Sequence, residues 1–160
     1  MIRTVSYFPS QCARNSGPVL DAVLSALTAQ GIDVKENSWT CDAVIIWSVL
    51  WHGRMAANQF AYEYYRKLNR PVIIVEVGAL IRGHTWKVSV NHVTANGYYG
   101  HQENLDWDRP KKLGIHLSKS VCTDPRIVIA TQHGRSLQLQ GIWQETWINQ
   151  LLDKLREVTD

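Results

Sequence analysis

The chain has 160 residues, of which 45% are hydrophobic, and its formal net charge at pH 7 is +3. A chain of this length and composition buries a sizeable core, which excludes intrinsic disorder and favours one domain or two small ones. No run reaches the roughly 18 consecutive apolar residues of a membrane span, and the first residues lack the apolar centre of a signal peptide. Positive charge spread along the chain permits an anionic partner without requiring one. We therefore expect a soluble, cytoplasmic protein that makes no contact with a membrane.

The first half of the chain alternates between strand and helix patterns. Residues 2–9 alternate apolar and polar side chains and end at Pro9, which predicts a strand. Residues 16–31 have apolar side chains at helical spacing, Ser16 as a candidate N-cap and Gly31 as a terminator, which predicts a helix. Apolar runs and helical spacing predict the next elements: strands at 33–39 and 42–49, a helix at 54–70 with Pro71 beyond it, and a strand at 71–78. This alternation predicts an α/β fold of the Rossmann-like type, with a mostly parallel sheet flanked by helices.

The second half of the chain has a weaker pattern. A short strand is predicted at 86–90, and loop signals follow it as far as residue 124. A buried strand at 125–132 and an amphipathic helix at 139–158 come next. We therefore predict a Rossmann-like domain over residues 1–124, while residues 125–160 either begin a second half or close the same domain.

Cysteines and aromatic residues bear on function. The three cysteines are widely spaced and form no CxxC pair, so reduced thiols are favoured over a disulfide framework or a zinc site. Seven tryptophans and six tyrosines are an unusual number for a chain of this length. Such side chains fill cores and subunit interfaces, but they also stack on sugars and bases. Both uses stay open from the sequence alone.

A single acid interrupts the buried strand predicted at 71–78. Glu76 stands near the end of this strand, where a carboxylate without a partner is costly to bury. In open α/β sheets, ligands bind outside the carboxyl ends of the strands, which makes Glu76 a candidate general base. A carboxylate that is paired with Arg82, or that caps the turn at Gly78, explains the pattern equally well.

Two segments near this acid carry side chains suited to binding. Residues 47–54 leave the neighbouring strand, so we expect Trp51, His52 and Arg54 at the same sheet edge, with Arg54 and backbone N–H groups suited to an anion. The loop after Glu76 contributes side chains for phosphate binding and aromatic stacking: Arg82, His84, Trp86, Lys87 and Asn91. Two simpler explanations fit the same residues equally well. His52 can have a structural role, and the loop after Glu76 can be an ordinary solvated loop.

A further polar segment follows the strand predicted at 125–132. Its backbone amides, together with four side chains, are suited to holding a diphosphate: Gln132, His133, Arg135 and Ser136. The segment lacks the Gly-Lys-Ser/Thr ending of a Walker A loop, and it is not GxGxxG. The sequence also contains no GxSxG elbow, no HExxH and no DxD cluster, so we predict no metal ligands.

Taken together, residues 42–53, 69–93 and 126–157 resemble a group of bacteriophage-associated, glycosyltransferase-like proteins with the two-domain GT-B architecture. The shared pattern comprises an Asp-led hydrophobic strand, a strand and turn of the type "PVIIVEVGALIRG", a Val-Asn segment and a later strand with a polar exit. The suspected functional relatives are phage enzymes that glycosylate 5-hydroxymethylpyrimidines in DNA.

The resemblance implies roles for particular residues. Glu76 matches the acid at the strand end and would be the base or acceptor-positioning group, with His52 as its substitute. Asn91 matches the Val-Asn position, and Gln132 and Ser136 match the polar exit that faces the donor. GT-B enzymes generally need no metal cluster, so no cofactor is implied beyond a UDP- or GDP-sugar as donor substrate. The acceptor would be DNA that carries a modified base, inside the host cell.

Members of this group continue after the helix that ends near residue 157 into the rest of the donor-binding half, whereas this chain ends at Asp160. Three explanations are open: a fragment, a natural single-domain relative, or a homodimer that completes its site by association. Two other function classes also fit the sequence. One is a non-catalytic module that binds a nucleotide or nucleic acid, and the other is a small hydrolase or deoxyribosyltransferase-like enzyme with Glu76 as nucleophile.

Overall fold

The structure is a computed structural model that describes residues 1–78, 80–101, 108–116, 126–132, 134 and 141–158. The chain divides into two compact units, Met1–Asn104 and Leu105–Asp160. The domain boundary predicted between residues 124 and 125 lies outside the described residues. Within the described ranges, no helix is long and apolar enough to span a membrane.

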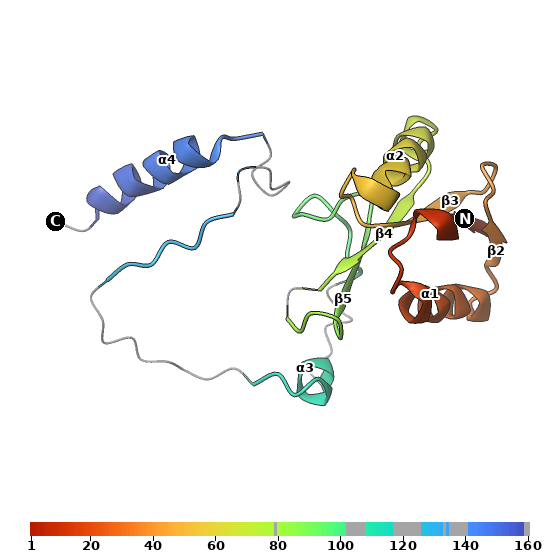
Figure 1. Cartoon of the computed structure of the whole chain (residues 1–160). Helices are drawn as coiled ribbons and strands as arrows, with labels where there is room; N and C mark the ends of the chain where they lie inside the picture. Colours follow the sequence, from red (N-terminus) through yellow and green to blue (C-terminus); the bar gives the residue numbers. More distant parts are fainter. Residues whose placement is uncertain (79, 102–107, 117–125, 133, 135–140, 159–160) are drawn as a thin grey trace. The chain divides into compact units, whose positions relative to one another are not determined.

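The first unit is built on a five-stranded sheet with the strand order β2-β1-β3-β4-β5 (Figure 1). The strands are β1 (Thr4–Tyr7), β2 (Asp33–Glu36), β3 (Ala43–Trp47), β4 (Val72–Val77) and β5 (Trp86–Val90). The first four run parallel, and β5 pairs with β4 in antiparallel orientation. This mostly parallel sheet with flanking helices confirms the predicted Rossmann-like α/β fold.

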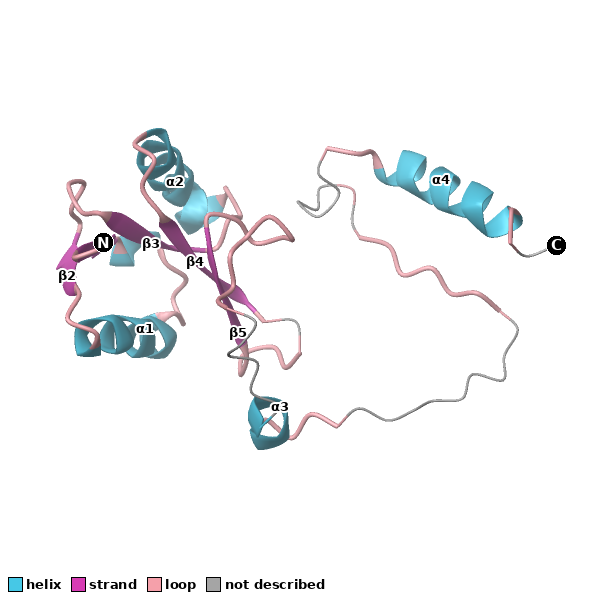
Figure 2. Cartoon of the chain, turned by 180° about the vertical axis from the view of Figure 1, so that it is seen from behind, coloured by secondary structure: helices cyan, strands magenta, loops and turns pink. Residues whose placement is uncertain are grey.

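Helices cover opposite faces of the sheet (Figures 1 and 2). α1 (Gly17–Ala29) follows β1, and α2 (Ala57–Lys67) follows β3. Each is preceded by a short 3-10 helix: η1 (Pro9–Gln11) lies before α1, and η2 (Gly53–Ala56) lies before α2. Both helices confirm the predictions from apolar spacing, and the Pro in the first turn of α1 needs no N–H there.

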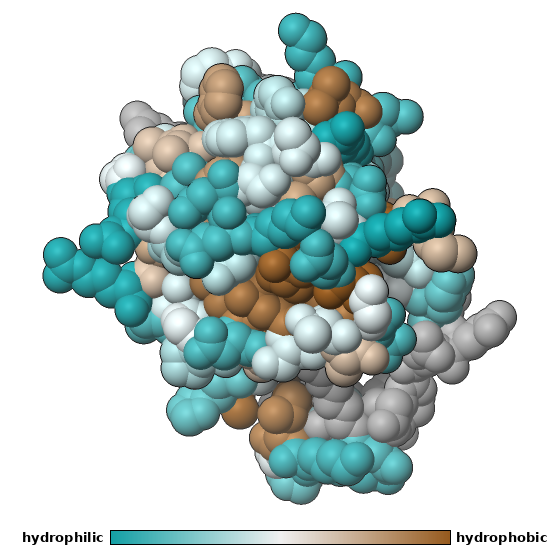
Figure 3. Space-filling model, turned by 90° about the vertical axis from the view of Figure 1, so that its right-hand side faces the viewer, coloured by the Kyte–Doolittle hydropathy of each residue, from teal (hydrophilic) through white to brown (hydrophobic). Residues whose placement is uncertain are grey.

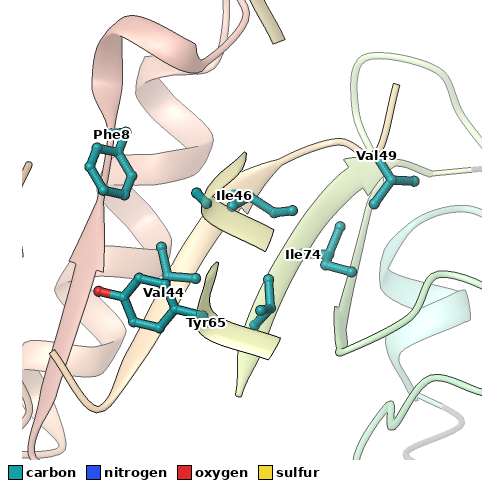
Figure 4. Packing of buried hydrophobic residues seen from close by; sticks show 8 residues of the cluster. Phe8, Val44, Ile46, Val49, Tyr65 and Ile74 are labelled. Carbon is teal, nitrogen blue, oxygen red and sulfur yellow. The ribbon is translucent and has the colours of Figure 1, made fainter. Parts of the chain in front are cut away.

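The core on the α2 side of the sheet contains alternate side chains of β3. Val44 and Ile46 pack there against Phe8, Tyr65 and Ile74 (Figure 4). Complete burial of such an aliphatic side chain stabilises the fold by about 1.5–3 kcal/mol. The whole of β3 is buried, as its continuous apolar sequence predicted, because helices cover both of its faces.

The core on the α1 side contains the other side chains of β3. Ile45 and Trp47 pack there with Leu20 of α1 and Val75 of β4. Trp86 of β5 lies partly buried against the same cluster. Trp47 and Trp86 therefore join the hydrophobic core to the carboxyl end of the sheet.

The edge strand β2 is protected by charge. Asp33, Lys35 and Glu36 are exposed, and Lys35 forms a salt bridge of 3.4 Å with Asp33. Charged side chains on an edge strand discourage pairing with another chain.

Figure 3 shows the side of the molecule on which β2 lies in Figure 1. Apolar side chains gather in the middle of this face, and hydrophilic side chains surround them.

Asp42 ties the start of β1 to the turn before β3. Its carboxylate accepts hydrogen bonds from the Arg3 N–H at 2.8 Å, the Thr4 N–H at 3.0 Å and the Thr4 hydroxyl at 3.1 Å. These donors, led by the Arg3 N–H and followed by those of Thr4, hold the pKa of Asp42 below its ordinary value of 3.8. The carboxylate is therefore better stabilised in the folded chain than in the unfolded chain.

This shift predicts an acid dependence of stability. A lowered pKa stabilises the folded state above the unfolded-state value of 3.8, and the gain is lost as pH falls from that value through the folded-state pKa. We expect Asp42→Asn to flatten the decline of the unfolding free energy over this window, measured by urea denaturation. Asp21→Asn, in an exposed position of α1, is the control. An equally steep decline in Asp42→Asn and the wild type would contradict the assignment.

The second unit contains α3 (Asp108–Lys112) and α4 (Gln144–Arg156). α4 confirms the amphipathic helix predicted near the end of the sequence, with Trp147 and Leu151 half-buried. The strand predicted over 125–132 is not formed at 126–132, the described part of that segment. A strand needs hydrogen bonds to a neighbouring strand, and the described residues of this unit contain no other strand to supply them. Val128 is accordingly 87% exposed.

Candidate functional site

A pocket of about 240 Å³ lies at the carboxyl edge of the sheet. It is lined by the last residues of β3 and β4, by the segments that follow β1, β3 and β4, and by the start of β5: Ala13, Asn15, Trp47, Ser48, Leu50, Met55, Glu76, Val77, Arg82, Gly83 and Trp86. Glu76, Arg82 and Trp86 are three of the residues that the sequence predicted for a site at this edge. The pocket therefore brings together a carboxylate, a guanidinium and an aromatic ring.

The order of the strands explains why a pocket forms here. The chain leaves β1 for α1 on one face of the sheet and leaves β3 for α2 on the other. Because β1 and β3 are neighbours, the connections that follow them diverge and leave a crevice between them. Asn58 of α2 links the segment after β1 to the end of β3, since its side-chain N–H groups donate to the Gln11 carbonyl at 3.1 Å and the Trp47 carbonyl at 2.6 Å.

Glu76 is held by two hydrogen bonds from the protein. Its Oε2 accepts from the Ser48 hydroxyl at 2.7 Å, and its Oε1 accepts from the Val77 N–H at 2.9 Å. An ionised carboxylate has about four acceptor positions, so about two remain for a ligand. Among the described residues no ion pair joins Glu76 to Arg82. The arrangement is that of an oriented acceptor beside an open pocket.

Aromatic and thioether side chains form the apolar wall. The ring centroids of Trp47 and Trp86 are 5.0 Å apart, with an interplanar angle of 53°. Trp47 is only 3% exposed, whereas Trp86 is half-buried and presents part of its ring to the pocket. Met55 adds a flexible side chain to the same lining. A flat, polar-edged group such as a base or a sugar ring fits this combination of stacking surface and carboxylate.

The turn between β4 and β5 brings Arg82 to the pocket. The Gly78 N–H donates to the Thr85 carbonyl at 2.9 Å, and the Thr85 hydroxyl bonds to both the N–H and the carbonyl of Ile81 at 3.1 Å. Gly83 has a φ of +83°, a left-handed conformation that suits glycine. Arg82 is exposed, so its guanidinium is available to an anionic group of a ligand.

Gly78 is required where this turn closes. A Cβ atom at residue 78 would overlap the backbone oxygen of Thr85, so the backbone would have to move. We expect Gly78→Ala to lower the unfolding free energy by about 1–3 kcal/mol and to weaken ligand binding through the displaced Arg82. Gly17→Ala, where the added Cβ meets nothing within 4 Å, is the control. Equal stability and equal affinity in Gly78→Ala and the wild type would contradict this view of the turn.

Other predicted residues near the sheet edge do not line the pocket as the described residues form it. Trp51 packs against Tyr62 on the α2 side, with ring centroids 5.6 Å apart. His52 and Arg54 are exposed at the start of η2, and His84 is exposed in the turn after β4. The sequence predicts that these residues lie near the carboxyl edge of the sheet. It does not determine on which face of the sheet each side chain lies.

Lys87 and Asn91 have structural contacts instead. The Lys87 ammonium donates to the Val93 carbonyl and lies 5.0 Å from the centre of the Tyr99 ring. The side-chain oxygen of Asn91 accepts from the Val72 N–H at 3.0 Å, and the backbone N–H of Asn91 donates to the Val72 carbonyl at 2.7 Å. Val72 begins β4, so Asn91 lies at the end of that strand opposite to the pocket. Its left-handed φ of 68° suits this edge contact.

The predicted donor-binding residues belong to the second unit. Gln132 is described and exposed. His133, Arg135 and Ser136 lie outside the described residues. The role of this segment in holding a diphosphate stays a prediction.

Sequence reasoning missed several residues that form the pocket. Ser48, Trp47 and Met55 lie in segments predicted only as a strand or a helix, and Asn15 is not part of any predicted site. The signal that could have found Ser48 is its position as the first polar residue after a five-residue buried strand. The contribution of Asn15 depends on the path of the chain after β1, which no motif indicates.

Two free cysteines of the described chain are buried, and neither lines the pocket. Burial raises the pKa of Cys12 to about 11, and the thiol donates to the Phe8 carbonyl at 3.4 Å. Cys12 is therefore a neutral core side chain at neutral pH and not a thiolate nucleophile. Cys41 is a free, buried cysteine, and Cys122 lies outside the described residues. In the part of the chain that the structure describes, no three His, Cys, Asp or Glu side chains gather into a metal site.

No protein-family model, no curated protein and no solved structure matches this chain. Its class is therefore defined by its own fold and pocket. The chain contains a Rossmann-like α/β unit with a carboxylate, a guanidinium and an aromatic wall at the carboxyl edge of its sheet.

Proposed function

We propose that this protein is a glycosyltransferase that moves a sugar from a nucleoside-diphosphosugar to a hydroxylated base in DNA, of the 5-hydroxymethylcytosine type. One observation carries the proposal. The Glu76 carboxylate, oriented by Ser48 and by the Val77 N–H, faces a pocket walled by Trp86 at the carboxyl edge of the sheet. The resemblance of the sequence to phage glycosyltransferase-like proteins adds the substrate class.

The chemistry needs one group to receive a proton. The acceptor hydroxyl of the base donates to Glu76 and then transfers its proton to the carboxylate, while the hydroxyl oxygen forms a bond to the anomeric carbon of the sugar. The bond between that carbon and the diphosphate oxygen breaks, and its electron pair leaves with the diphosphate. General-base assistance of this kind contributes about 10²–10⁴-fold to a rate.

The remaining pocket residues would bind the acceptor. A base stacks on the exposed part of Trp86, and the Arg82 guanidinium contacts a phosphate of the nucleic-acid backbone. A volume of about 240 Å³ suits one ring-sized group, so we assign the pocket to the acceptor base. The sugar nucleotide would be held by the predicted donor segment around Gln132, without an obligate metal.

A glycoside hydrolase is less well supported. Hydrolysis of a glycosidic bond generally uses two carboxyl groups that flank the bond. Glu76 is the one acid among the residues that line the described pocket. Transfer to an activated hydroxyl, with diphosphate as the leaving group, needs one base and no paired acid.

Intact-mass spectrometry tests this proposal. The full chain is incubated with oligonucleotides that contain 5-hydroxymethylcytosine and with a panel of UDP- and GDP-sugars. We expect a mass gain of one hexose or N-acetylhexosamine on the hydroxymethylated oligonucleotide and none on the matched cytosine oligonucleotide. Binding of the oligonucleotide without any mass gain would instead support the alternative, a non-catalytic module that binds nucleic acid.

A further inference from the structure

Ser48 has an unusual backbone conformation for its residue type. It follows β3 directly and has a φ of 66°, in the left-handed region that non-glycine residues seldom adopt. Three other non-glycine residues with positive φ are asparagines, a type enriched in that region: Asn37, Asn69 and Asn91. Strained residues of this kind cluster at functional sites, where the surrounding structure fixes them. Ser48 is 2% exposed and lines the pocket.

The hydrogen bonds of Ser48 determine the direction of its hydroxyl proton. Its Oγ accepts from the Leu50 N–H at 3.1 Å and lies 2.7 Å from Oε2 of Glu76. A serine hydroxyl has one proton to donate, and the carboxylate is an acceptor, so the proton lies between Oγ and Oε2. The Ser48 N–H donates to the Val75 carbonyl at 2.8 Å, which fixes the backbone next to Glu76. Ser48 therefore presents a donor of fixed direction to the carboxylate.

We infer that Ser48 is a positioning residue for Glu76. Its hydroxyl holds Oε2, so the acceptor positions of the carboxylate that are not used by the protein face the pocket and meet the ligand hydroxyl. This inference rests on the proposed function for its catalytic consequence, but its structural part concerns the orientation of Glu76 alone. A misplacement of about 1 Å in a catalytic group costs on the order of 100-fold in rate.

Two substitutions of Ser48 distinguish the effect of its hydroxyl from the effect of its strained backbone. Ser48→Gly removes the hydroxyl and relieves the positive φ, whereas Ser48→Ala removes the hydroxyl and keeps the strain. Asn69→Gly is the matched control, because Asn69 has a φ of 55° at the end of α2 and does not line the pocket. A positioning role predicts the same effect on Glu76 for both serine variants and no effect for Asn69→Gly.

The first measurement uses the protein without any ligand. The ¹³C resonance of the Glu76 side-chain carboxyl is identified by its loss in Glu76→Gln and is then compared among the variants at one neutral pH. We expect it to shift or broaden in Ser48→Gly and Ser48→Ala and to stay in place in Asn69→Gly. An unchanged Glu76 resonance in both serine variants would overturn the inference, whatever the protein catalyses.

The second measurement is a double-mutant cycle on transfer rate. Ser48→Gly is expected to lower kcat by about 10- to 100-fold, with little change in KM, and to have no further effect when Glu76→Gln is already present. Equal losses from Ser48→Gly in both backgrounds would mean a structural role independent of Glu76 and would overturn the inference. Absence of transfer by the wild type would count against the proposed function, while the carboxyl resonance would still decide the role of Ser48.

Discussion

Glu76→Gln is expected to lower the rate of sugar transfer by about 10²–10⁴-fold, because the variant removes the group that receives the proton of the acceptor hydroxyl. Glutamine keeps the length and shape of the side chain, and its carbonyl oxygen can still accept from the Ser48 hydroxyl. We therefore expect KM to change little and the loss to fall on kcat. Single-turnover kinetics with a hydroxymethylated oligonucleotide provide the measurement.

The fold should tolerate this change. Glu76 is half-buried at the end of β4, and the amide oxygen of glutamine can replace the oxygen that accepts from Ser48. The Val77 N–H, whose bond to Glu76 is exposed, can then donate to water. Glu63→Gln is the matched control, since Glu63 is exposed on α2 and does not line the pocket. Full activity in Glu76→Gln, or an equal loss in Glu63→Gln, would remove Glu76 from the mechanism.

Asn58→Ala should cause the largest loss of stability among the variants considered. Asn58 is 1% exposed, and its side chain donates to the carbonyls of Gln11, in η1 after β1, and of Trp47, the last residue of β3. Alanine removes the donor from the buried bond to Trp47, at a cost of about 1–3 kcal/mol, and from the part-buried bond to Gln11, at a cost of about 1 kcal/mol. We expect the unfolding free energy in urea to fall by about 2–4 kcal/mol.

A neighbouring residue provides the control for this prediction. Gln59 is exposed on α2 and donates to the Glu63 carboxylate at 2.9 Å. Gln59→Ala should change the unfolding free energy by no more than about 0.5 kcal/mol, the usual effect of a surface substitution. If Asn58→Ala were as stable as Gln59→Ala, the hydrogen bonds of Asn58 to Gln11 and Trp47 would not contribute to the stability of the fold.

Much of the first unit could be predicted because local pattern and tertiary environment agree. The continuous apolar run that became β3 is buried on both faces, and a strand in that position requires such a run. Helical spacing and terminators predicted α1 and α2, since amphipathic helices must cover the sheet. The run at 127–129 is equally apolar, but it does not form a strand, and the described residues of its unit contain no strand with which it could pair.

The site was predictable only in part. Strand ends indicate an edge of the sheet, which was enough for Glu76, Arg82 and Trp86. The direction of each side chain depends on backbone conformation that sequence patterns do not contain. Lys87 follows Trp86 directly in β5, and successive side chains of a strand point to opposite faces, so the two residues of one predicted binding loop are separated.

The central claim is that the pocket at the carboxyl edge binds the hydroxymethylated base. Indole N–H resonances of tryptophan test it directly, because Trp86 lines the pocket and Trp39 packs against Phe8 and Tyr64 in the core on the other side of the sheet. During titration with a single-stranded oligonucleotide that contains 5-hydroxymethylcytosine, we predict a shift of the Trp86 resonance and none of the Trp39 resonance. A shift of Trp39 with an unmoved Trp86 would contradict the account.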